Sequence, residues 1–93
     1  MPGFELIGKE EYKEIQDLFE NSGILFRHGF DAMRNDIFKV RDFEKKFSKK
    51  LGVADSLAVS SGTAALKVAL EAIGVGRGDE VITQAFTFVA TVE

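Results

Sequence analysis

The sequence predicts an α/β fold, and three segments of its second half support this prediction. The apolar run at residues 57–60 is typical of a short buried strand, and residues 80–83 are typical of a second one. Between them, residues 63–73 are rich in alanine, leucine and valine and leave little polar face, which predicts a helix. Strand, helix and strand within about thirty residues form a βαβ unit, which crosses over right-handed and needs helices on both faces of its sheet.

The first half of the chain predicts two amphipathic helices joined by an irregular connection. Apolar side chains at helical spacing, with charged residues between them, predict helices over residues 9–20 and 40–51. The second helix is followed by Gly52, a common terminator. Residues 24–37 have no clear period, so we expect an irregular connection with at most one helical turn, near residues 31–35.

Composition excludes several classes of function. A chain of 93 residues is at most one domain, and 45% apolar residues with nine phenylalanines are enough to build a core. The absence of cysteine excludes disulfides and thiol chemistry. A net charge of −3, with basic and acidic residues interspersed, argues against a nucleic-acid partner. Since no apolar run approaches the ~20 residues of a membrane span, we expect a cytoplasmic protein without a membrane segment.

The candidate site lies at the turn from the first predicted strand into its helix, Ser60-Ser61-Gly62-Thr63. Serine or threonine before a helix caps a backbone N–H, and glycine allows a ligand close to the backbone. Free amides at such a helix start suit a phosphate. The same residues also make ordinary turns, so a phosphate site and a purely structural turn both remain open. The turn is neither a Walker A loop nor a dinucleotide fingerprint, because it lacks both spacings.

Other residues of possible chemical interest have ordinary structural explanations. The glycines of residues 74–78 follow a helix instead of opening one, so we expect a turn there. The single histidine, His28, is expected in a loop, with a place in the lining of a cleft as the alternative. The sequence assigns no metal-binding residue.

Three blocks of the sequence resemble a known family. Residues 60–66, 74–82 and 86–91 are similar, in order and spacing, to the opening third of the large domain in the DegT/StrS-type sugar aminotransferases. The resemblance covers residues 40–93 well and residues 1–39 only loosely. It implies an N-terminal helix and connection followed by the start of a fold-type-I large domain, with part of a doubly wound sheet. That domain binds pyridoxal 5′-phosphate in members of the family.

The resemblance also implies a function and a set of contacts. Family members are homodimers that pass an amino group from glutamate or glutamine to a ketosugar, usually carried on a nucleotide. Carried over by position, the cofactor phosphate falls on Gly62, Thr63 and Ala64, and the aromatic that stacks on the pyridine ring falls on Phe88. Without the resemblance, Phe88 would be expected in the core. Gln84 stands where many members have proline, a departure that affects how the chain leaves the second strand.

The catalytic groups of the family are not matched by any residue of this chain. The family's cofactor-pairing aspartate and Schiff-base lysine correspond to positions beyond residue 93, and Lys67 is expected to be a solvated helix residue. Two alternatives therefore stay open: a sugar dehydratase of the same family that uses the aminated cofactor, and a noncatalytic module that binds a phosphorylated molecule or a partner chain. Residues 88–93 resemble the first turns of a longer helix, so we expect an inactive, poorly monomeric piece of a longer enzyme.

Overall fold

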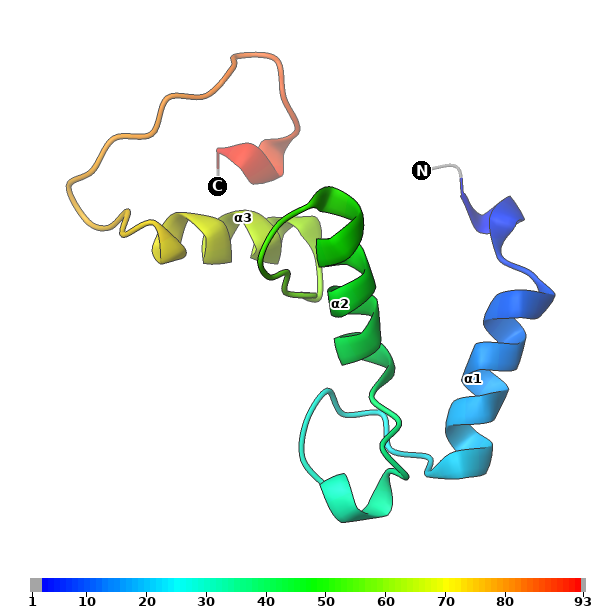
Figure 1. Ribbon diagram of the computed structural model, residues 1–93. Helices are drawn as coiled ribbons and strands as arrows, with labels where there is room; N and C mark the ends of the chain where they lie inside the picture. Colours follow the sequence, from blue (N-terminus) through cyan, green and yellow to red (C-terminus); the bar gives the residue numbers. More distant parts are fainter. Residues whose placement is uncertain (1–2, 93) are drawn as a thin grey trace. The chain divides into compact units, whose positions relative to one another are not determined.

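A computed structural model describes residues 3–92 and shows two units, Met1–Ser56 and Leu57–Glu93 (Figure 1). The first unit, drawn from blue to green, contains two α-helices and two short 3₁₀ helices, and the second contains one of each. This division follows internal contacts, and the sequence-based division at residue 40 stays a prediction. The elements are η1 (Phe4–Leu6), α1 (Lys9–Asn21), η2 (Asp31–Met33), α2 (Lys39–Leu51), α3 (Gly62–Ala72) and η3 (Val89–Thr91).

The three predicted helices are confirmed to within one or two residues at each end. The helical turn expected near residues 31–35 is present as η2. Gly52 ends α2 in the left-handed conformation, with φ of 69°, which a residue without a Cβ adopts at little cost. The N–H of Val53 then donates to the carbonyl of Ser48 at 3.1 Å, which satisfies one of the last carbonyls of the helix.

The predicted strands are the main correction. Neither residues 57–60 nor residues 80–83 form a strand, and no strand occurs anywhere in residues 3–92. A strand is defined by a ladder of hydrogen bonds to a neighbour, and these two segments have no such ladder with each other. Leu57 is 55% exposed and Ile82 is 98% exposed. The α/β sheet is therefore not confirmed, and the regular structure of this part of the chain is helical.

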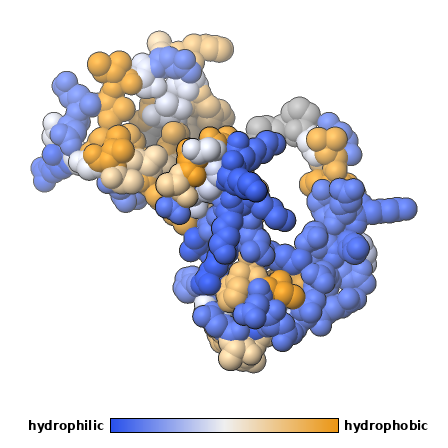
Figure 2. All heavy atoms as spheres, in the orientation of Figure 1, coloured by the Kyte–Doolittle hydropathy of each residue, from blue (hydrophilic) through white to orange (hydrophobic). Residues whose placement is uncertain are grey.

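The expectation of a hydrophobic core is also wrong for the described residues. None of the hydrophobic side chains in residues 3–92 is buried, and the buried residues there are Arg34, Glu44 and Ser48. Every α-helix exposes large apolar side chains, for example Ile15 on α1 and Phe43 on α2. Figure 2 shows such hydrophobic residues in orange at the surface. Apolar composition thus supplies the material for a core without forming one within these residues.

Ion pairs join α1 to the first residue of α2. Lys39 Nζ lies 2.6 Å from Glu14 Oε2 and 2.7 Å from Asp17 Oδ2. The hydrogen bond and the charge of Lys39 lower the pKa of Asp17, and the hydrogen bonds to Asp17 and Glu14 raise the pKa of Lys39. Glu14 and Asp17 are 67% and 45% exposed and Lys39 is half-buried, so water screens these ion pairs and their contribution to stability is small.

Candidate functional site

The turn into α3 has the geometry of a capped helix start. Ser61 is extended, with φ of −161° and ψ of 164°, and its hydroxyl oxygen accepts a hydrogen bond from the N–H of Ala64 at 3.1 Å. Its carbonyl accepts from the N–H of Ala65 at 3.0 Å. The amides of Gly62 and Thr63, which precede the helical ladder, have no acceptor within the part of the chain that the structure describes.

The surroundings of these two amides suit an anion. Gly62 and Thr63 are exposed, and open space lies where a Cβ on Gly62 would stand. The Thr63 hydroxyl makes no hydrogen bond to other residues in the range 3–92. The first turn of α3 carries no acidic side chain, so the positive end of the helix dipole is not neutralised locally. Two amides and one hydroxyl are therefore available to an incoming phosphate.

Phe88, the aromatic expected to stack on the cofactor ring, is the residue before η3. It is 76% exposed, and its ring stacks on no other ring among residues 3–92. In this structure it is not a core residue. The short helix η3 contacts α3 within the same unit, so the phosphate turn and the predicted stacking aromatic belong to one body (Figure 1).

The remaining sequence-based assignments fall on ordinary structure. The glycine-rich segment after α3 forms a turn, with φ of 84° at Gly74 and 95° at Gly78. The N–H of Gly76 donates to Asp79 Oδ2 at 2.8 Å, which closes that turn. His28 is an exposed loop residue and Lys67 an exposed helix residue. No group of three histidine, cysteine, aspartate or glutamate residues that could hold a metal occurs in the described range, and no helix there is long and apolar enough to cross a bilayer.

A second cluster, which the sequence analysis missed, is formed by residues of the connection after α1 and of the first turn of α2. We call Arg27, Arg34, Phe38 and Arg41 the arginine cluster. The Arg34 guanidinium donates to the carbonyl oxygens of Phe26 and His28, the latter at 3.2 Å. The guanidinium carbons of Arg34 and Arg41 lie 5.0 and 4.4 Å from the Phe38 ring centroid. The three arginines stand seven residues apart, at positions 27, 34 and 41, but Arg27 and Arg34 lie outside the α-helices, so this helical spacing does not account for the cluster.

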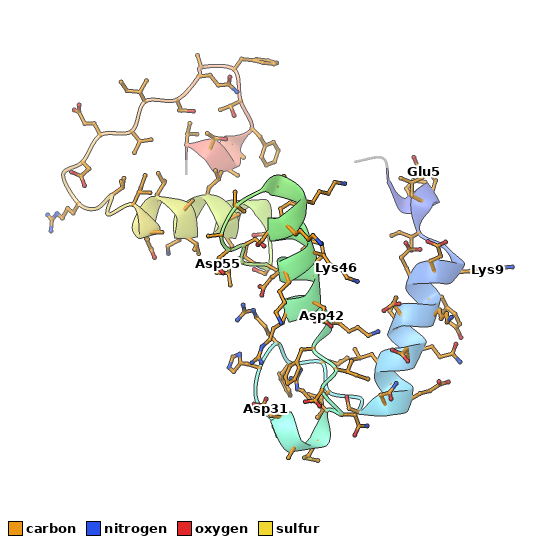
Figure 3. All side chains as sticks on the ribbon, in the orientation of Figure 1. Glu5, Lys9, Asp31, Asp42, Lys46 and Asp55 are labelled. Carbon is orange, nitrogen blue, oxygen red and sulfur yellow. The ribbon has the colours of Figure 1, made fainter. Side chains whose placement is uncertain are left out.

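The arginine cluster contains one ion pair. Arg27 binds Glu44 through both carboxylate oxygens, at 2.9 and 3.0 Å from its Nη2. Asp31 and Asp36, in the same connection, are exposed and form no ion pair with other residues of the described range. Figure 3 places Asp31 at η2 and Asp42 on α2.

An open, acid-free helix start with a free threonine hydroxyl has the chemistry that suits a phosphate. The comparison with known families identifies the family to which the chain belongs. The model of the DegT/DnrJ/EryC1/StrS aminotransferase family matches residues 12–93, and the chain belongs to that family.

Individual relatives agree with the family match. SpsC, a spore coat polysaccharide biosynthesis protein of Bacillus subtilis, is 45% identical over 86 residues, which are 92% of this chain and 20% of SpsC. EpsN of the same organism, named for a pyridoxal phosphate-dependent aminotransferase, is 48% identical over 56% of this chain and 13% of its own length. The dTDP-3-amino-3,4,6-trideoxy-alpha-D-glucose transaminase of Micromonospora megalomicea is 45% identical over 57% of this chain and 14% of its own. The chain therefore spans about a fifth or less of these relatives.

Proposed function

We propose that this chain supplies the phosphate-binding turn of a pyridoxal phosphate-dependent sugar aminotransferase. The proposed enzyme passes an amino group from glutamate or glutamine to a ketosugar carried on a nucleotide. The observation that carries the proposal is the open N-terminus of α3, where the amides of Gly62 and Thr63 have no acceptor among residues 3–92 and no carboxylate lies in the first turn. Because the chain belongs to an aminotransferase family, we propose that the phosphate bound at this turn is that of pyridoxal phosphate.

The residues of the turn would share the work of holding the cofactor. Gly62 and Thr63 would donate two backbone N–H groups to the phosphate, and Thr63 would add its hydroxyl. The amide of Ala64 already donates to Ser61, so it would reach the phosphate only after the serine rotates away. Phe88 would cover one face of the pyridine ring, an offset stack worth about 0.5–1.5 kcal/mol beyond its buried area. When bound, the cofactor supplies an electron sink that the side chains lack.

The transfer reaction needs residues that the matched part of the relatives does not contain. The chain corresponds to about a fifth of SpsC, and we propose that the reactive lysine belongs to the remaining length. The 93 residues alone would then bind the cofactor phosphate weakly and catalyse no transfer. As the family resemblance implies, we propose that the complete enzyme is a homodimer. From the composition of the sequence we also propose that it is cytoplasmic.

A pair of ligands tests the phosphate turn directly. Pyridoxine 5′-phosphate lacks the aldehyde and so does not react with lysines, and pyridoxine lacks the phosphate as well. Equilibrium dialysis of the 93-residue chain should show that the phosphate ester binds at least about tenfold more tightly, because charge-assisted hydrogen bonds contribute roughly 1.5–3 kcal/mol. Equal affinity for the two ligands would show that the turn binds no phosphate.

Reduction with borohydride tests the proposal that the reactive lysine is absent. After incubation with pyridoxal phosphate, reduction and peptide mapping, adducts should spread over several exposed lysines at low occupancy. A single stoichiometric adduct on Lys67, or on any other lysine of the chain, would contradict this assignment.

A further inference from the structure

The arginine cluster carries more positive charge than its neighbours neutralise. Arg34 is only 3% exposed, yet no carboxylate of residues 3–92 forms an ion pair with it. Its Nε is buried and has no hydrogen-bond partner in the same range. Buried charges in proteins are normally paired, because removing an ion from water is costly. The carbonyl oxygens of Phe26 and His28 supply partial negative charge only.

Arg41 also lacks an ion pair among the described residues and is more exposed than Arg34. Its guanidinium stacks on the Phe38 ring, is half-buried, and makes no hydrogen bond or ion pair with other described residues. Its N–H donors are therefore open to an acceptor from outside. The neighbouring cations are already engaged, since Arg27 is paired with Glu44 and Lys39 with Glu14 and Asp17.

We propose that Arg41, together with the buried Arg34 that contacts the same Phe38 ring, forms a binding site for a diphosphate group. Two guanidinium groups without a carboxylate match the charge of a phosphate group carrying about two negative charges better than that of one carboxylate. The planar fork of arginine fits the paired oxygens of a phosphate. Arg34 is a positioning residue, because it holds the backbone of the loop at Phe26 and His28.

The source of that diphosphate rests on the proposed function, in which the ketosugar is carried on a nucleotide. The cofactor phosphate is assigned to α3 in the other unit, so different residues hold the two anions. The arginine cluster would then recognise the diphosphate of the nucleotide.

Equilibrium dialysis with inorganic pyrophosphate at fixed ionic strength tests the site. Arg41→Gln should weaken binding about tenfold or more, because it removes charged hydrogen-bond donors. Arg77→Gln is the matched control, since Arg77 is an exposed arginine of the other unit, and it should leave the affinity unchanged. Equal losses in both variants would show that pyrophosphate responds only to net charge and would overturn the proposal.

A second variant and a competition experiment test the site if Arg41→Gln disturbs the helix. If Arg41→Gln lowers the helical content seen by circular dichroism, Arg41→Lys replaces it, because lysine keeps the charge and the helix propensity but loses the fork. Unchanged pyrophosphate affinity in Arg41→Lys would overturn the proposal. A nucleoside diphosphate should displace pyrophosphate and glutamate should not. Displacement by glutamate would reassign the site to a carboxylate and overturn it as stated.

The same variants separate this site from the cofactor turn. Thr63→Val should not change pyrophosphate binding to the arginine cluster, and Arg41→Gln should not change the binding of pyridoxine 5′-phosphate. If the cofactor ligand fails to bind while pyrophosphate binding depends on Arg41, the proposed function is wrong and the anion site stands. If pyridoxine 5′-phosphate binds while pyrophosphate binding does not depend on Arg41, the anion site is wrong and the proposed function stands.

Discussion

The N-termini of α1 and α3 are chemically opposite. At α1, the N–H of Gly8 donates to Glu11 Oε2 at 2.7 Å, and hydrogen bonds from backbone N–H groups, first that of Gly8, lower the pKa of Glu11. At α3, a neutral serine hydroxyl occupies one amide and the first turn has no acid. The N-cap amide of α1 is thus closed by an internal carboxylate, and the first turn of α1 holds two acids, Glu10 and Glu11, whereas the first turn of α3 holds none. The first amides of α3 can therefore receive an external anion without a carboxylate of their own turn repelling it, unlike those of α1.

The largest change in phosphate affinity should come from placing a carboxylate in the first turn of α3, as α1 has in its own first turn. Thr63→Glu removes the hydroxyl and places a negative charge at the amides, so we expect the affinity for pyridoxine 5′-phosphate to fall by more than about a hundredfold. Thr83→Glu adds the same charge to an exposed threonine of the same unit and should change the affinity little. Equilibrium dialysis compares them, and a similar loss in both variants would remove the distinction between the helix ends.

Removing only the Thr63 hydroxyl should lower the affinity for the cofactor phosphate by an intermediate amount. Thr63→Val deletes one charge-assisted hydrogen bond, worth roughly 1.5–3 kcal/mol or about ten- to a hundredfold in affinity for the cofactor phosphate. Phe88→Leu should weaken cofactor binding by less. Because both side chains are exposed, the helical content of the unliganded chain should not change. Unchanged affinity together with a large loss of helix would show that the residues are structural.

The smallest effect is expected for Glu11 of α1, whose carboxylate caps the helix and should affect only its helical content. The pKa of Glu11 is lowered below its ordinary value of 4.5, so its contribution to the helix is present above that value and is lost as the pH falls through the lowered pKa. Glu11→Gln should remove this acid-induced loss of helicity and leave phosphate binding unchanged. Circular dichroism between pH 2 and pH 7 measures it. A wild-type helix signal without acid dependence would mean that the Glu11 carboxylate does not cap α1.

The helices were predictable because their signals are local. Apolar spacing and Gly52 define α2 within thirteen residues, and Ser61 marks the start of α3. The strands were not predictable in the same sense. An apolar run such as residues 57–60 becomes a strand only beside another strand, and its own sequence does not say whether that neighbour is present.

Of the two candidate sites, the phosphate turn could be predicted from local sequence and the arginine cluster could not. The phosphate turn follows from residue types at a helix start, so Gly62 and Thr63 were identified from sequence alone. The arginine cluster was not, because it depends on a loop with left-handed backbone at Phe30 and Asn35 that brings Arg34 under the carbonyl of Phe26. Asparagine adopts this conformation more readily than most residues, but a bulky residue such as Phe30 rarely does, so the local sequence does not predict it there.

The absence of a buried hydrophobic side chain among residues 3–92 has a calorimetric consequence. The heat capacity change of unfolding arises mainly from apolar surface that becomes hydrated, and about 1.1–1.4 kcal/mol/K would be normal for a folded chain of this length. A chain whose apolar side chains are already hydrated has little such surface left to expose. Its helices should therefore melt gradually, with a heat capacity change far below that range and a shallow dependence on denaturant.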